Sequence, residues 1–209
     1  MVIRIFALIL TIIILPFLLL IGLLVFLSTK GFPLFAQKRA ITLEGRVFYI
    51  YKFRTMKKHT KQYPSGSIFY KPELEREVTR FGLFLRKTGL DEILQLINIV
   101  KGDMSFIGPR PLSVEDLEIM KKDFPEIYSS RARINLKPGI TGYWQILGDR
   151  KSGMEDLLLN DLYYFKNRSL KLNLKILALT IKTIVTRTHS DSIISTQDKI
   201  SVNKSVPAR

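Results

Sequence analysis

The 209-residue sequence contains no cysteine and only two histidines, His59 and His189. The absence of cysteine excludes a disulfide framework, a thiolate nucleophile and a thiolate metal site. Two histidines are too few for a histidine-rich metal site. A divalent metal would therefore need oxygen ligands, which favours Mg²⁺ or Mn²⁺.

Acidic residues are also scarce. The chain has 33 lysines and arginines against 18 aspartates and glutamates, which gives a formal net charge of +15 and a pI near 10.0. Such a surplus predicts a polyanionic partner, which can be nucleic acid, an acidic membrane surface or a phosphorylated substrate. The length allows one soluble domain together with an additional segment.

One long run of the chain carries no charge at all. Residues 5–27, IFALILTIIILPFLLLIGLLVFL, are long enough to cross a bilayer core of about 30 Å at about 1.5 Å per residue. A cleaved signal peptide would have a shorter apolar region of about 7–15 residues that ends in small residues, and LSTKGFP fits poorly. We predict a membrane-embedded N-terminal helix over residues 1–30. It can span the bilayer, or it can turn back at the kink that Pro16 introduces.

Basic residues are unequally distributed around this run. Before it stands Arg4, and after it come Lys30, Lys38, Arg39, Arg46, Lys52 and Arg54. The positive-inside rule then predicts that the rest of the chain lies in the cytoplasm.

The remaining chain shows local patterns of mixed type. Residues 32–56 are rich in β-formers and predict two short strands, with a turn near Gly45. The apolar spacing predicts helices over 73–87, 90–100, 114–123 and 170–187, and Gly102 is placed to end the second of them. The Gly/Pro clusters and polar runs predict loops over 59–67, 102–111 and 136–144 and a polar tail over 188–209. In the helix over 170–187, three lysines (Lys171, Lys175 and Lys182) fall within one narrow arc. This pattern suits a helix in the membrane interface and equally a core helix with a solvated stripe; the apolar run favours the interface.

Two adjacent acids, Asp91 and Glu92, stand within a basic region. One interpretation is structural: Thr88 and Asp91 would form a T-x-x-D capping box, and acids in a first helical turn suit the helix dipole. The other interpretation is chemical. The loop GDMSFIGPRP holds Arg110 between two prolines, which pre-positions a guanidinium for phosphate, and a carboxylate can bind Mg²⁺ that bridges to a diphosphate. From the acids alone, capping is favoured; the loop favours chemistry.

Four blocks resemble the bacterial sugar transferase family in order and spacing. They are KFRTM (52–56), LDEILQLINIVKGDMSFIGPRPL (90–112), KPGITG (137–142) and NDLYYFKNRSLKLNLKIL (160–177). The family comprises monotopic polyprenyl-phosphate phosphoglycosyl transferases, here of the minimal single-domain type, and the resemblance runs from about residue 1 to 187. It implies a mainly α fold with a small β-hairpin, a membrane-embedded N-terminal helix (1–30), a cytoplasmic catalytic domain (31–187) with interfacial amphipathic helices, and a polar tail (188–209).

The resemblance also implies an activity. The family transfers a sugar-1-phosphate from a UDP-sugar to polyprenyl (undecaprenyl) phosphate on the cytoplasmic face of the bacterial inner membrane. UMP is released, and the step initiates assembly of a surface or protein-linked glycan. The implied partners are UDP-sugar, polyprenyl phosphate and inner-membrane lipid, without nucleic acid, and a homo-oligomer is left open.

Site residues follow from the same resemblance. Asp91 would be the nucleophile that carries a phosphosugar, Glu92 would assist, and both would bind Mg²⁺. Substrate binding would fall to Lys52, Arg54, Arg86, Arg110, Arg133 and Gln145.

Two positions depart from the family pattern. Leu15 precedes Pro16 where serine is usual, and Asp149 follows Gly148 where arginine is usual. Three alternatives stay open: direct transfer in a ternary complex with the acids only as metal ligands, an inactive membrane-anchored adaptor, and a basic nucleic-acid binder. The last lacks any helix-turn-helix, zinc-finger or RNA-recognition pattern.

Overall fold

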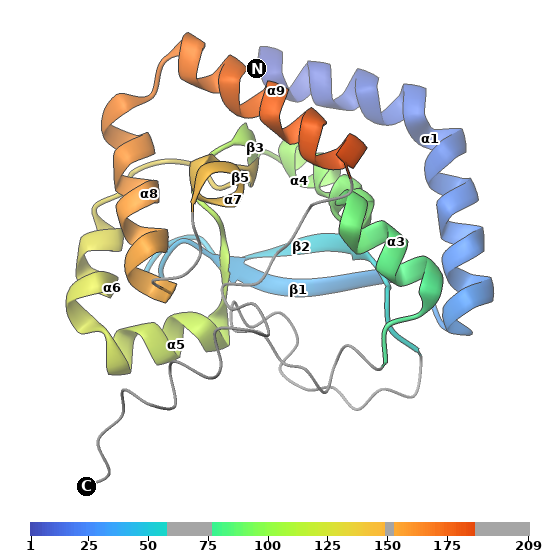
Figure 1. Ribbon diagram of the computed structural model, residues 1–209, viewed down its shortest axis with the longest axis horizontal. Helices are drawn as coiled ribbons and strands as arrows, with labels where there is room; N and C mark the ends of the chain where they lie inside the picture. The colour runs from blue at the N-terminus through green and yellow to red at the C-terminus, as the bar shows by residue number, and fades with distance from the viewer. Residues whose placement is uncertain (58–76, 149–152, 187–209) are drawn as a thin grey trace, which may run out of the picture.

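The computed structural model describes residues 1–57, 77–148 and 153–186 (Figure 1). The predicted loop over 59–67, the first part of the predicted helix over 73–87, Asp149 and the predicted tail over 188–209 lie outside the described residues. The elements in chain order are α1 (Val2–Thr29), β1 (Leu34–Ala40), β2 (Phe48–Phe53), α3 (Arg80–Thr88), the 3₁₀ helix η1 (Leu90–Gln95), α4 (Leu96–Lys101), β3 (Ser105–Ile107), β4 (Leu112–Ser113), α5 (Val114–Asp123), α6 (Pro125–Ala132), β5 (Gly139–Thr141), α7 (Tyr143–Leu147), α8 (Gly153–Asn167) and α9 (Leu170–Thr186). The mainly α fold with small sheets confirms the predicted fold class.

The predicted β-hairpin forms the centre of the molecule (Figure 1). Strand β1 pairs antiparallel with β2, in a register that runs from Leu34 opposite Phe53 to Arg39 opposite Phe48. The short strand β4 joins the other edge of β1 and gives the order β2-β1-β4. Alternation of side chains along β2 buries Phe48 and Ile50 on one face. Phe53, at the end of the strand, is buried in a separate cluster against α1 and α3.

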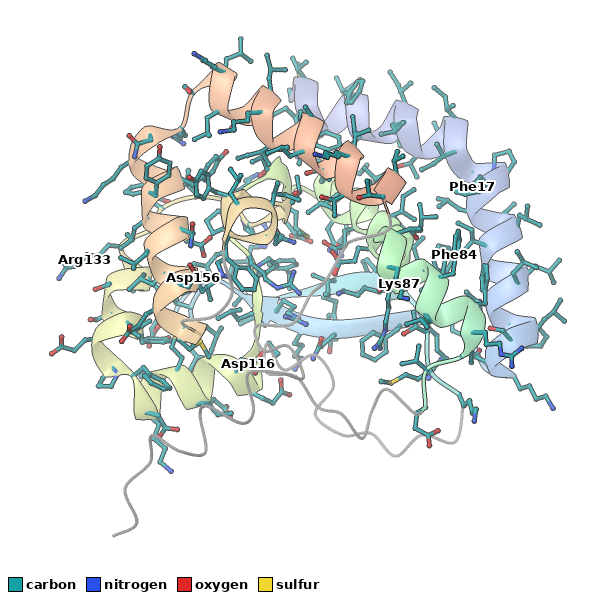
Figure 2. The ribbon with its side chains drawn as sticks, viewed as in Figure 1. Phe17, Phe84, Lys87, Asp116, Arg133 and Asp156 are labelled. Carbon is teal, nitrogen blue, oxygen red and sulfur yellow. The ribbon has the colours of Figure 1, made fainter. Side chains whose placement is uncertain are left out.

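Helix α1 bends sharply and packs along two sides of the molecule (Figure 1). Figure 2 places Phe17 at the corner, so the bend lies beside Pro16, and it forms although Leu15 lacks the hydroxyl of a serine. The arm before the bend buries Ala7 in a cluster with Ile99. The arm after it buries Leu18, Ile21 and Val25 in a cluster with Phe53, Leu85 and Leu94. Both arms of α1 therefore lie against the same body.

Large apolar side chains are exposed on the other face of α1 and along α9. In α1 they include Ile9, Ile13, Leu20 and Phe26, which are 52% to 69% exposed. In α9, whose residues are all described, Ile176 is the buried one. A core helix with a solvated stripe would bury its apolar residues, so that alternative for residues 170–187 is wrong. The membrane-interface alternative stays a prediction.

Several predicted helix bounds and loops need correction. Helix α3 begins at Arg80, because the Thr79 hydroxyl accepts a hydrogen bond from the Gly82 N–H (2.9 Å) and caps it there; the described residues before it are not helical. The predicted helix over 90–100 is η1 followed by α4, and Gly102 ends α4 with a φ of 85° as predicted. The helix over 114–123 matches α5.

The two predicted Gly/Pro loops meet each other through short strands. Strands β3 and β5 pair in parallel, with Ser105 opposite Gly139 and Ile107 opposite Thr141. Each strand has three residues, which is too short for an alternating pattern to show in the sequence. Helices α6, α7 and α8 were also not predicted. They form a core with α5 in which Leu117, Met120, Trp144 and Leu157 are buried.

Candidate active site

The acid pair lies on a tight turn between α3 and α4. Gly89 follows α3 with a φ of 70°, a left-handed conformation that glycine adopts without strain, and η1 begins at the next residue. Asp91 and Glu92 are 5% and 4% exposed. Thr88 is the last residue of α3, and its hydroxyl donates back to the carbonyl oxygens of Phe84 (2.9 Å) and Leu85 (3.0 Å). The capping-box interpretation of Thr88 and Asp91 is therefore wrong.

One of the predicted substrate-binding residues, a lysine, contacts one of the two acids. Lys52, on β2, forms an ion pair with Glu92, and their side chains are 13% and 5% exposed. A carboxylate removed from water needs such a partner, because an unpaired buried charge is costly. The pair fixes the carboxylate of Glu92 beside the end of the hairpin.

A small cavity opens beside this pair. It is lined by Arg39, Ile50, Lys52, Glu92, Gln95, Arg110, Pro111, Gly139, Ile140 and Gln145. Of the predicted site residues the cavity gathers Lys52, Glu92, Arg110 and Gln145, with Asp91 preceding Glu92 on the same turn. Three cations around one acid give the cavity a positive balance, which suits a ligand with phosphate groups.

Arg39 is a cavity residue that the sequence analysis missed as a site residue. It is 3% exposed, its Nη1 donates to the Pro111 carbonyl oxygen (3.1 Å), and its Nη2 donates to Gln37 Oε1 (3.0 Å). The sequence signal that could have identified Arg39 is the alternation of side chains along β1. Phe35, Gln37 and Arg39 occupy every second position of β1 and therefore share one face.

The two glycine-rich loops form one wall of the cavity by close backbone contact. A Cβ on Gly139 would lie 2.1 Å from the Gly108 nitrogen, and a Cβ on Gly142 would lie 2.2 Å from the Gly108 carbonyl oxygen. The Gly108 N–H donates to the Thr141 carbonyl oxygen (3.0 Å). Glycine at these three positions thus lets two segments, 31 positions apart from Gly108 to Gly139, join without side chains between them.

Arg110 projects from this wall over an aromatic ring. Its guanidinium carbon lies 5.8 Å from the centre of the Trp144 ring, and the side chain is almost fully buried. The Trp144 indole N–H donates to Asp156 Oδ2 (2.8 Å), and Figure 2 shows Asp156 on α8 beside this region. Gln145 Nε2 donates to the Ile140 carbonyl oxygen (3.1 Å) and shapes the adjoining wall.

Three predicted binding residues lie elsewhere among the described residues. Arg54 Nε donates to the Phe32 carbonyl oxygen, and Arg86 Nε donates to Thr55 Oγ1, each at 2.8 Å. Arg133 is exposed after α6 and points away from the body at its edge (Figure 2). None of the three is among the residues that line the cavity.

A magnesium ion at the acid pair would have to bind together with phosphate. Among the described residues there is no group of three or more histidine or carboxylate side chains that could hold a metal. Mg²⁺ in phosphate-handling sites is commonly bound by one or two carboxylates together with substrate phosphates and water. Asp91 and Glu92 are the two carboxylates on this turn that would supply that donor set.

Comparison with known proteins places these residues in a family context. The family model described as bacterial sugar transferase matches residues 2–187. A galactosyl transferase CpsE of Streptococcus agalactiae serotype III is 33% identical over 164 residues, which cover 74% of this chain and 35% of the relative. An uncharacterized sugar transferase EpsL of Bacillus subtilis is 36% identical over 157 residues, covering 74% and 71%. A UDP-glucose:undecaprenyl-phosphate glucose-1-phosphate transferase of Xanthomonas campestris is 36% identical over 170 residues, covering 79% and 34%. The chain spans about a third of the length of the first and the last of these relatives.

Proposed function

The chain belongs to the bacterial sugar transferase family, and we propose that it transfers a sugar-1-phosphate from a UDP-sugar to polyprenyl phosphate with release of UMP. The name of the Xanthomonas relative supports both substrate classes, since it pairs UDP-glucose with undecaprenyl phosphate. The observation that carries the proposal is the cavity, which Lys52, Arg39 and Arg110 line together with Glu92 of the acid turn.

The charge balance of the cavity suits a diphosphate. A nucleotide sugar brings two phosphate groups, and bidentate guanidinium groups are the side chains best matched to phosphate oxygens. Arg110 is the strongest candidate for such a contact, because the prolines on either side restrict its backbone. Lys52 supplies a point charge that also holds Glu92 in place.

The nucleophile in this proposal is Asp91. A carboxylate oxygen of Asp91 attacks the phosphorus that carries the sugar, and the bond to the bridging oxygen breaks. That oxygen leaves with its electron pair on UMP, and the sugar-phosphate stays on Asp91 as an acyl phosphate. A phosphate oxygen of polyprenyl phosphate then attacks the same phosphorus, and the Asp91 carboxylate leaves. Dividing the transfer into two displacements lets the two substrates use one site in turn, with ping-pong kinetics.

Asp91 and Glu92 would also hold Mg²⁺. The bound metal offsets the negative charge of the phosphates, so that a carboxylate can approach them. Glu92 would keep its orientation through Lys52.

The membrane arrangement suits a lipid-linked acceptor. We infer that α1 is re-entrant at the cytoplasmic face of a bacterial inner membrane, because both arms pack on one body while the outer face is apolar. The cluster of basic residues after α1 agrees with that face. The acceptor's hydrocarbon tail would stay in the bilayer while its phosphate meets the site at headgroup depth, the level at which the exposed leucines and lysines of α9 would lie.

The first experiment measures UMP release. Full-length protein in detergent is incubated with Mg²⁺, a short-chain polyprenyl phosphate and a panel of UDP-sugars. We expect UMP from at least one donor with the wild type and none with Asp91→Asn. Asp116→Asn is the matched control, since Asp116 is also buried but lies on α5 (Figure 2), and it should keep activity. UMP from Asp91→Asn at the wild-type rate, or silence of the folded wild type with every donor, would overturn the proposal.

A second measurement separates double displacement from direct transfer. Without polyprenyl phosphate, double displacement predicts one equivalent of UMP and a phosphosugar mass on the peptide that contains Asp91. Direct transfer in a ternary complex predicts neither.

A further inference from the structure

A second pair of buried charges lies behind the cavity wall. Arg131 on α6 and Asp161 on α8 form an ion pair, and the two residues are 0% and 1% exposed. Neither is among the cavity-lining residues. Arg131 Nε also donates to the Ile41 carbonyl oxygen (3.1 Å), so the pair joins α6, α8 and the end of β1.

The pair binds both main-chain groups of one residue, Arg110. Arg131 Nη2 donates to the Arg110 carbonyl oxygen, and the Asp161 carboxylate accepts a hydrogen bond from the Arg110 N–H. Arg39 donates to the next carbonyl oxygen, that of Pro111. Three buried charged side chains thus hold three consecutive peptide groups.

These bonds remove the freedom that the prolines leave. Pro109 and Pro111 have fixed φ angles, and a residue before proline is restricted to extended conformations. The remaining motion of Arg110 is rotation of its flanking peptide planes, which hydrogen bonds to its N–H and carbonyl oxygen oppose. The direction of its side chain over Trp144 follows from that backbone.

The groups around the Asp161 carboxyl are those expected of a carboxylate that accepts hydrogen bonds from Arg131 and Arg110. Burial raises the pKa of the Asp161 carboxyl, while the Arg131 guanidinium and the Arg110 N–H act in the opposite direction. Buried ion pairs are frequently no more stabilising than apolar residues of the same volume. The directional bonds to Arg110 are what an apolar pair would not supply.

We propose that Arg131 and Asp161 are positioning residues, which fix the backbone of Arg110 so that its guanidinium faces the cavity. The inference rests on the proposed function in so far as Arg110 binds a substrate phosphate. The competing explanation is that the pair only ties α6 to α8 within the core.

A double-mutant cycle separates the two explanations. Wild type, Asp161→Asn, Arg110→Ala and the double variant are compared as full-length proteins in detergent, by kcat/KM for UMP release and by tryptophan emission. Trp144 is the only tryptophan of the chain, so its emission reports the stacked guanidinium without requiring activity. Asp103→Asn is the matched control, because Asp103 is a buried carboxylate paired with Arg46.

If the pair positions Arg110, the effect of Asp161→Asn on kcat/KM should depend strongly on whether Arg110 is present. Asp161→Asn should lower kcat/KM by roughly 100-fold, the effect of about 1 Å of misplacement, and by less than about twofold once Arg110 is alanine. It should shift Trp144 emission only while Arg110 is present. Asp103→Asn should have the same effect in both backgrounds. An equal loss from Asp161→Asn in both backgrounds, with unchanged emission, would overturn the proposal.

A second variant covers the case in which Asp161→Asn does not fold by circular dichroism. Arg131→Lys keeps a positive charge beside Asp161 but lacks the fork that also reaches Arg110. Wild-type activity and emission in Arg131→Lys would overturn the proposal, and a loss of both that depends on Arg110 would support it. If the wild type releases no UMP, the proposed function fails, and the emission cycle still decides whether the pair positions Arg110.

Discussion

Gly82 offers a stringent test of how α3 positions the acid turn. A Cβ at this position would lie 2.1 Å from the Thr55 carbonyl oxygen and 2.8 Å from its carbonyl carbon. Carbon–oxygen contacts normally exceed about 3.3 Å, and both atoms belong to backbone. Gly82→Ala must therefore displace α3 from the end of β2 by roughly 1 Å.

The displacement should reach the site. Helix α3 carries Arg86, which donates to Thr55 Oγ1 (2.8 Å), and it ends at Thr88, just before the turn that bears Asp91. Overpacking costs about 1–3 kcal/mol, which corresponds to a fall in melting temperature of roughly 2–12 °C for a chain of this size. Misplacement by about 1 Å should lower kcat/KM for UMP release by about 100-fold.

Gly22→Ala is the matched control for this substitution. Gly22 also lies in a helix against the end of β2, but its Cβ would meet Phe53 Cε1 at 3.8 Å, an ordinary contact. Its alanine variant should melt at the wild-type temperature or slightly above it. Thermal unfolding and UMP release are measured for both variants in one detergent. Wild-type melting and turnover of Gly82→Ala would refute the reasoning.

Three further predictions concern acid stability, the metal and the helix α1. Lys121 and Tyr128 lower the pKa of Glu44 from 4.5 to about 2; this contribution to stability is full above pH 4.5 and is lost as the pH falls toward 2. Glu44→Gln should therefore flatten the decline of the melting temperature over that range, and an unchanged decline would contradict the pairing. Chelation with EDTA should stop UMP release and added Mg²⁺ should restore it, whereas full turnover in EDTA would exclude the metal. Ile21→Ala, at a 3% exposed position, should cost about 2–5 kcal/mol in thermal unfolding, while Leu20→Ala, at a 53% exposed position, should change little; equal effects would argue against docking of this arm.

Sequence patterns predicted the helices and strands that are stabilised by residues close to them in the chain. The helix over 114–123 was predicted at its observed bounds, and the structure shows that its start is local in origin: Ser113 caps it and acids fill its first turn. The hairpin over 32–56 followed from β-rich runs on either side of a turn. Strands β3 and β5 were missed because each acquires its structure from the other, across a long separation in the chain.

The candidate site was predicted only in part, because some of its residues are positioned by contacts with distant parts of the chain. Arg131 and Arg133 both stand near the end of α6, and the sequence analysis selected Arg133. Two residues on a helix differ by about 200° in direction, so one can be buried while the other faces outward, as is observed. The ion-pair partner, Asp161 on α8, determines that Arg131 is the buried arginine. The sequence of α6 alone contains no pattern that identifies this partner.

The bent helix α1 has a consequence for where this protein can work. Its arms cover Ile99 and Leu85, which are 0% exposed in its presence, and Leu85 belongs to the helix that leads to the acid turn. Removing α1 from the domain would open that core to water. The membrane attachment proposed for α1 is therefore not a tether that can be cut to release a working soluble domain: a domain without α1 would lose the helix that covers its core, and with it the packing behind the acid turn.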